Sequence, residues 1–243
     1  MTYCVGLKID RGLVFMSDTR TNAGMDSIST FRKMHVWEQP GERVIVLMSA
    51  GNLATTQAVV SLLDERTKAI TERHSTLLET PSMYQTVRMV GDTVKEVIAS
   101  SSPVGEKADS YFNASFILGG QIKGSAPRLF MIYPEGNFIE STDDTPFFQV
   151  GETKYGKPII VRTYDREMSF AEAVKLLIVS FDSTLKSNLS VGLPLDLLFL
   201  ERDAFKVGLK RRIGQDDQYY RTISDGWSNA LKTAFASLPD FPG

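Results

Sequence analysis

The 243-residue sequence has few of the side chains that common catalytic and metal sites require. It contains one cysteine, Cys4, and two histidines, His35 and His74. A single cysteine cannot form an internal disulfide, and a lone thiol is typical of a reducing compartment. A Ser-His-Asp or Cys-His site needs an imidazole beside its nucleophile, and no G-x-S-x-G motif supplies such a serine. We therefore expect no cofactor, no metal site and no catalytic role for either histidine.

The sequence also lacks a strong excess of charge and any long apolar segment. The formal net charge is −2, and no stretch approaches the roughly 18 apolar residues that a membrane-spanning helix needs. No basic region followed by a long apolar one resembles a secretion signal. We expect a cytoplasmic protein that binds neither nucleic acid nor membrane, and we interpret the run Lys210-Arg211-Arg212 as a solvated surface.

One short motif resembles a nucleotide site but is incomplete. Residues 151–158, GETKYGKP, match the G-x-x-x-x-G-K pattern. The next position should carry a hydroxyl for magnesium, and Pro158 has none. The sequence therefore predicts no nucleotide site, so any ATP-dependent unfoldase that serves this protein would be a separate partner.

Turn residues, alternation and helical spacing predict a regular order of strands and helices. Strands are expected at 3–9, 13–16, 30–37, 43–48, 113–118, 129–133, 137–140, 147–150 and 195–200. Helices are expected at 52–73, 82–100, 153–164 and 224–237. A further helix is expected to begin after a capping box formed by Ser169 and Glu172. No linker separates the two rounds of strands and helices. We predict a single α+β domain over residues 1–243, with stacked antiparallel sheets covered by helices and with residues 203–243 as a C-terminal extension.

The first two strands predict a neighbour for the start of the chain. If the Asp10-Arg11-Gly12 turn pairs Ile9 with Leu13, the ladder sets Cys4 beside Asp18 and Thr2 beside Arg20. The hairpin alone therefore brings a carboxylate close to residue 2, although a one-residue shift would exchange the faces of the strand.

Thr2 is a candidate nucleophile that needs no histidine. Once Met1 is removed, Thr2 carries a hydroxyl and a free α-amine, whose pKa of about 7.7 to 8.0 leaves much of it neutral and able to accept the hydroxyl proton. A cation would favour the alkoxide, and a carboxylate would hold that cation. Lys33 and Asp18 are the candidates. Gly51, which precedes a predicted helix, could donate its N–H to an oxyanion.

These residues lie in segments that resemble a known family. The stretches TYCVGLKIDRGLVFMSDTRTNAG, STFRKM and VLMSAGNLATT resemble the N-terminal half of proteasome β-type subunits, which are threonine peptidases of the N-terminal-nucleophile (Ntn) hydrolase superfamily. The length and the stretch FDSTLKSNLSVGLPLDLLFLERD are most similar to the bacterial ancestral β-subunit (Anbu) branch. The resemblance covers about the first 200 residues.

The resemblance implies a four-layer αββα sandwich, assembly of identical subunits into a ring or an open helical turn, and hydrolysis of a peptide or protein substrate. It assigns catalytic roles to Thr2, Asp18, Lys33 and Gly51. It also places Thr21 and Asn22 where the substrate backbone binds, and Ser49 in a specificity pocket. The turn before Lys33 is one residue short for the family, so Arg32 is an alternative match. We prefer Lys33, because arginine cannot exchange a proton.

Two departures from the family pattern lie near the predicted nucleophile. Glu152 stands where the family has a serine, and Ser187 stands where it has an aspartate, three residues before Ser190. Together with Arg20, the residues Glu152, Ser187 and Ser190 are candidates for a surrounding shell, a second layer of side chains around the catalytic residues. The departures leave two alternatives open: a weakly active or non-catalytic ring scaffold on the same fold, and a small-molecule amidohydrolase of the same superfamily.

Overall fold

The computed structural model describes residues 2–22, 28–68, 76–101 and 112–242. His74 lies outside these ranges. The strands are β1 Tyr3–Ile9, β2 Gly12–Asp18, β3 Arg20–Asn22, β4 Ile28–Thr30, β5 Met34–Gln39, β6 Arg43–Gly51, β7 Ala114–Ile122, β8 Arg128–Ile132, β9 Phe138–Glu140, β10 Phe147–Gly151, β11 Leu195–Glu201 and β12 Leu209–Ile213. The helices are α1 Leu53–Lys68, α2 Met83–Ser101, α3 Lys157–Thr163, α4 Phe170–Ser187 and α5 Gln218–Ala236.

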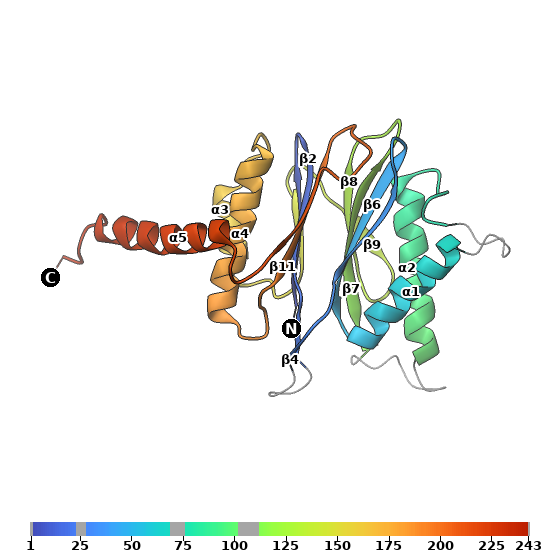
Figure 1. Cartoon of the computed structure of the whole chain (residues 1–243), viewed down its shortest axis with the longest axis horizontal. Helices are drawn as coiled ribbons and strands as arrows, with labels where there is room; N and C mark the ends of the chain where they lie inside the picture. The colour runs from blue at the N-terminus through green and yellow to red at the C-terminus, as the bar shows by residue number, and fades with distance from the viewer. Residues whose placement is uncertain (1, 23–27, 69–75, 102–111, 243) are drawn as a thin grey trace.

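Two five-stranded antiparallel sheets stack face to face, with helices on both outer surfaces (Figure 1). The first has the order β10-β1-β2-β11-β12, and α3 and α4 cover it. The second has the order β5-β6-β7-β8-β9, and α1 and α2 cover it. A third apolar core fills the space between the sheets. The predicted αββα sandwich is confirmed.

Strand β6 illustrates how the sequence determines these layers. Its five consecutive residues 44–48 are all apolar, and every residue of the strand but the last is buried. Ile45 and Leu47 point into the core beneath α1 and α2, whereas Val44, Val46 and Met48 point into the core between the sheets. A strand that is covered on both faces has no polar alternation, which is what the sequence shows.

The predicted register of the first hairpin is wrong by one residue. Ile9 pairs with Gly12, and Cys4 pairs with Ser17. The turn therefore contains only Asp10 and Arg11. Gly12 lies in the strand at a φ of +148°, where an added Cβ would meet the Leu200 carbonyl oxygen at 2.0 Å. The close approach of β11 thus requires glycine inside the ladder, where the sequence suggested a turn.

The helices follow the predictions with shifted ends. The capping box at Ser169 and Glu172 is confirmed at the start of α4. Helix α3 is shorter than predicted, because it begins only at Lys157, and α5 is longer, because Asp217 caps it before residue 218. No helix among the described residues is long and apolar enough to cross a membrane.

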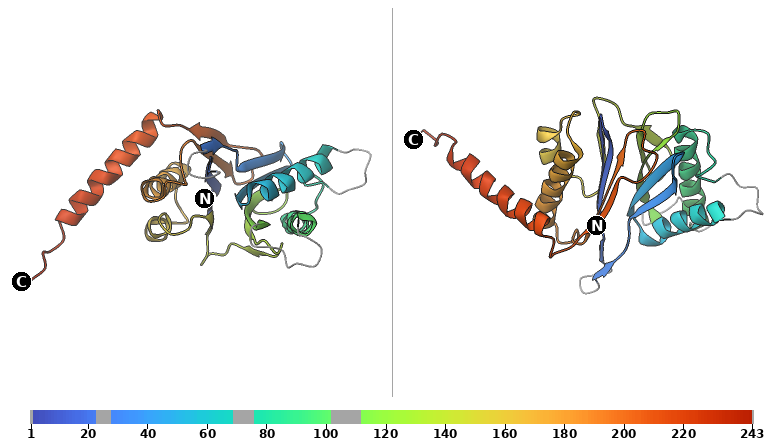
Figure 2. Two further views of the ribbon diagram at one scale, coloured as in Figure 1. Left: turned by 90° about the horizontal axis from the view of Figure 1, so that it is seen from below. Right: turned by 45° about the horizontal axis from the view of Figure 1, so that its top comes forward.

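The C-terminal residues form a strand and a projecting helix. Strand β12 was not predicted; it pairs with β11 and forms one edge of the sheet, with Lys210, Arg211 and Arg212 exposed. Helix α5 leads away from the body of the molecule (Figure 2). Its first half is attached to α4 through the buried Asp182, which accepts hydrogen bonds from the hydroxyls of Tyr220 and Ser224.

Candidate active site

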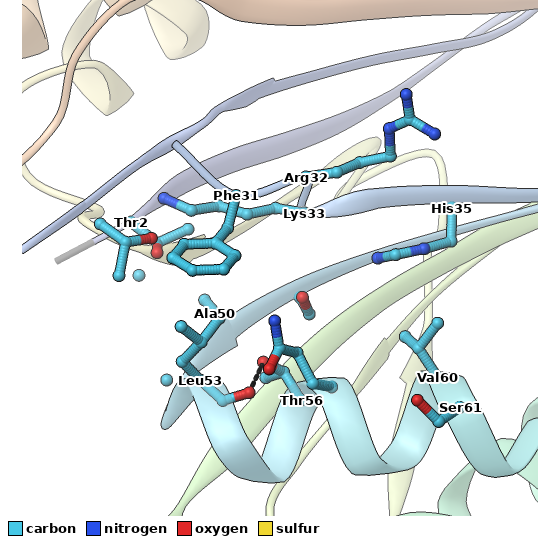
Figure 3. A pocket seen from close by; sticks show the side chains of 15 residues that line it. Thr2, Phe31, Arg32, Lys33, His35, Ala50, Leu53, Thr56, Val60 and Ser61 are labelled. Atoms are coloured by element: carbon cyan, nitrogen blue, oxygen red, sulfur yellow. Dashed lines mark hydrogen bonds between the residues drawn. The ribbon is translucent and has the colours of Figure 1, made fainter. Parts of the chain in front are cut away.

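A cavity of about 720 Å³ lies between the edge of the second sheet and the start of α1. Thr2 lies at one end of it, and His35 and Ser61 lie toward the other (Figure 3). Gly151 also lines the cavity and is in contact with Thr2. The start of β1, the end of β10, the start of β5, the end of β6 and the first turns of α1 all meet here. The topology therefore brings the beginning of the chain beside residues that follow it by 20 to 150 positions.

The main chain of Thr2 is held from two sides. The Glu152 amide donates a hydrogen bond to the Thr2 carbonyl oxygen at 2.6 Å, and the next amide, that of Tyr3, donates to Asp18 Oδ1 at 3.0 Å. Gly151 has a φ of +85°, and a Cβ there would lie 2.0 Å from the Thr2 carbonyl oxygen. A glycine at this position therefore permits β10 to approach the first residues of the chain.

Asp18 and Lys33 form a buried ion pair next to Thr2. Lys33 Nζ donates to Asp18 Oδ1 at 2.7 Å and to the Arg20 carbonyl oxygen at 2.7 Å, and the two side chains are 5% and 0% exposed. Burial raises the pKa of the Asp18 carboxyl, while the Lys33 ammonium and the Tyr3 amide act in the opposite direction. Figure 3 shows the ammonium pointing toward Thr2.

Arg32 does not join this pair. Its guanidinium is exposed and points away from Thr2 and from α1 (Figure 3). The two adjacent residues leave the chain in different directions, so the geometry favours Lys33 over Arg32 as the cation beside the candidate nucleophile.

Gly51 lines the cavity at the junction of β6 and α1. Its φ is +116°, and a Cβ would lie 2.3 Å from the Asn113 carbonyl oxygen, so glycine is required. Asn52 begins the helix by accepting a hydrogen bond from the Thr55 amide at 3.1 Å. The partial positive charge of the α1 N-terminus is thus next to Gly51, where it would stabilise a developing negative charge.

The predicted substrate-binding residues are divided between the cavity and its edge. Thr21 and Ser49 both line the cavity. Asn22 ends β3, and its side chain is outside the described structure. Arg20 lies in β3 as well, but its guanidinium is directed to the Leu189 carbonyl oxygen at 3.0 Å.

Glu152 forms a hydrogen-bonded bridge that sequence reasoning did not anticipate. Glu152 is buried. Its carboxylate accepts one hydrogen bond from the Lys154 amide at 2.8 Å and another from Asn188 Nδ2 at 2.9 Å. Asn188 in turn accepts from the Ser190 amide at 2.9 Å. In the sequence, only the position of Asn188 between two of the candidate shell residues could have drawn attention to it.

Ser187 is not part of this bridge. It is exposed, and its hydroxyl donates to the Ser183 carbonyl oxygen at 2.9 Å within α4. The structure therefore brings Glu152 and Ser190 into one network through Asn188 and leaves Ser187 in the last turn of its own helix. Within the described ranges, no cluster of three or more His, Cys, Asp or Glu side chains could hold a metal ion.

Comparisons with known proteins give one consistent result. The model of the proteasome subunit family matches residues 2–192. A Gly-1 variant of Anbu from Hyphomicrobium sp. strain MC1 is 55% identical over 100% of both chains, with a TM-score of 0.93. Anbu from Yersinia bercovieri is 49% identical over 99% of both chains, with a TM-score of 0.93.

A third similar structure is described as a helical assembly of the Anbu complex from Pseudomonas aeruginosa. It is 45% identical, covers 99% of this chain and 98% of its own, and has a TM-score of 0.91. The search of curated proteins gave no match.

Proposed function

The chain belongs to the proteasome subunit family, and we propose that it is a threonine peptidase subunit that hydrolyses peptide bonds with Thr2 after removal of Met1. The predicted resemblance to Anbu β-subunits agrees with the similar structures. The observation that carries the proposal is the buried Asp18–Lys33 pair, whose ammonium is directed at Thr2. An ion pair that is almost completely buried has a substantial desolvation cost, so its position at the end of a cavity favours a functional role.

Each residue has a distinct role in the proposed reaction. The free α-amine of Thr2 accepts the proton of the Thr2 hydroxyl, and the oxygen attacks the substrate carbonyl carbon. The Lys33 ammonium stabilises the negative charge on the attacking oxygen, and Asp18 fixes the position of that ammonium. The Gly51 amide donates to the oxyanion of the tetrahedral intermediate. The amine then returns the proton to the leaving nitrogen, and water hydrolyses the resulting ester of Thr2.

Assembly is the second part of the proposal. Because the relative from Pseudomonas aeruginosa forms a helical assembly and matches almost the whole chain, we propose that copies of this chain assemble in a ring or an open helix. Peptide or protein substrates would enter that assembly, and any ATP-dependent unfoldase would be a separate protein. The one cysteine is buried and unpaired, which supports the expected cytoplasmic location.

Intact mass and active-site labelling test the chemistry together. The protein purified from its native cells should lack one methionine, and a threonine-directed electrophile should add one label to it. A Thr2→Ala variant should take no label, while Arg88→Gln, a surface substitution on α2, should be labelled like the parent. A full-length mass with no labelling would reject the proposal. Parallel assays with peptides and with simple amides would separate a peptidase from a small-molecule amidohydrolase.

A non-catalytic scaffold is the second candidate, and one observation favours it. The shell around Thr2 has an acidic side chain at Glu152, and Ser187 is directed away from it. A scaffold predicts that cells carrying Thr2→Ala behave like the parent while the assembly persists. Loss of the cellular function in that variant, with the assembly intact, would eliminate the scaffold.

A further inference from the structure

The cavity beside Thr2 carries an excess of positive charge. Arg32 and Lys33 line it, and among the described residues no aspartate or glutamate does. Asp18 neutralises Lys33. The nearest acid along α1 is Asp64, whose carboxylate accepts a hydrogen bond from the Trp37 indole N–H at 2.8 Å. Arg32 therefore leaves the cavity with a net positive charge.

Arg32 also lines a second, smaller cavity of about 270 Å³, so the two cavities share this side chain. Lys210, Arg211 and Arg212 of the edge strand β12 line the second cavity, together with Asp196. We call Arg32 and these three β12 residues the basic groove. The guanidinium of Arg32, which belongs to this groove, points away from Thr2 (Figure 3).

Two of the four cations of the basic groove are neutralised locally. Arg212 makes two hydrogen bonds to Asp196, at 2.7 and 2.9 Å, and Arg211 pairs with Asp217. No ion pair of the described residues involves Arg32 or Lys210, and both side chains are exposed. These two charges are thus available to an external anion; Arg32 lines both cavities, and Lys210 lines the second.

We propose that this site selects peptide segments with acidic side chains, whose carboxylates bind Arg32 and Lys210 while the peptide backbone lies along the cavity to Thr2. The inference rests on the proposed function, because it names the substrate class of that site. The acidic residue is expected a few positions from the attacked carbonyl group and not immediately beside it, since Arg32 points away from Thr2 (Figure 3).

Binding to a full-length Thr2→Ala variant separates recognition from chemistry. A labelled hexapeptide is compared with versions that carry glutamate, glutamine or lysine at each position in turn. At the preferred position, glutamate should bind more tightly than glutamine by about two- to fivefold for each ion pair formed. The difference should shrink between about 0.05 and about 0.5 M salt, because exposed ion pairs are screened.

A matched pair of charge variants locates the effect. Arg32→Gln with Lys210→Gln should abolish the preference for glutamate, whereas Arg88→Gln with Lys123→Gln, which removes the same charge from exposed positions outside both cavities, should retain it. Retention of the preference in the first variant, or loss of it in the second, would overturn the inference. So would a single-stranded oligonucleotide that binds the basic groove as tightly as the acidic peptide.

The two proposals fail separately. A protein with a free Thr2 amine that binds acidic peptides selectively and cleaves none would reject the peptidase and leave the selectivity standing. Cleavage that is indifferent to acidic side chains, together with binding that is equally indifferent, would reject the selectivity and leave the peptidase.

Discussion

Arg32 and Lys33 are neighbours in the sequence, yet their side chains lie in two contrasting regions of the molecule. Lys33 is buried, neutralised by Asp18 and fixed by the Arg20 carbonyl oxygen. Arg32 is exposed in the basic groove and has no ion-pair partner in the described part of the chain. The comparison shows that two neighbouring positive charges can have opposite environments, one buried in an ion pair and one exposed without an ion-pair partner in the described residues.

The largest expected effect comes from removing each cation in turn. Lys33→Gln leaves the buried Asp18 carboxyl without its cation, so the free energy of unfolding should fall by about 3 to 5 kcal/mol. Arg32→Gln removes an exposed charge and should change it by no more than about 0.5 kcal/mol. Urea unfolding at one protein concentration measures both. Equal losses in the two variants would show that the two regions do not differ as described.

A second pair of substitutions tests the buried region further. Glu152→Gln replaces an acceptor by an NH₂ group that faces a donor, either Asn188 Nδ2 or the Lys154 amide, so the free energy of unfolding should fall by about 1 to 3 kcal/mol. Ser187→Ala removes only an exposed hydroxyl bound within its own helix and should stay within about 0.5 kcal/mol of the parent. The same unfolding assay serves, and a larger loss for Ser187→Ala would contradict the assigned network.

The smallest effect concerns His35, which lines the Thr2 cavity. Burial lowers the pKa of His35 from 6.5; the Asp64 charge and a hydrogen bond with the Arg32 backbone oppose this shift, whereas the positive charges of Arg32 and Lys210 add to it. The unfolded chain therefore takes up a proton that the folded chain does not, and stability falls as the pH drops below about 6.5 toward the folded pKa. This contribution is at most about 1.4 kcal/mol per pH unit.

Replacing the imidazole isolates that contribution. The stability difference between the parent and His35→Gln should shift in favour of the variant as the pH is lowered from about 7.5 to about 5.5. Unfolding curves at several pH values measure it, and parallel pH dependence in the two proteins would exclude this role of His35.

Local patterns in the sequence were sufficient to predict much of the fold. The apolar run of β6, the helical spacing of α4 and its capping box all depend on residues that lie within a few positions of one another in the sequence. The register of the first hairpin did not, because it depends on the Leu200 carbonyl oxygen, which lies almost 190 residues beyond Gly12. Strand β12 was missed because it is an exposed edge strand whose charged residues show no apolar alternation.

The candidate site shows the same limit. The order of Thr2, Asp18 and Lys33 in the sequence was enough to propose their proximity, and the structure places Asp18 and Lys33 in contact. The link from Glu152 through Asn188 to Ser190 could not be anticipated, because it joins β10 to the loop after α4 across the tertiary structure. Arg32 and the β12 residues line one cavity although they are far apart in the sequence, and this arrangement also depends on the sheet topology.

The anchoring of residue 2 also bears on how such a protein would mature. Both hydrogen bonds that fix this part of the backbone, from the Glu152 amide and to Asp18, engage atoms on the C-terminal side of the bond between residues 1 and 2. Hydrolysis of that bond would thus require no refolding. On the proposed function, an unprocessed subunit would therefore be a folded zymogen, kept latent by one amide linkage and activated in a single covalent event.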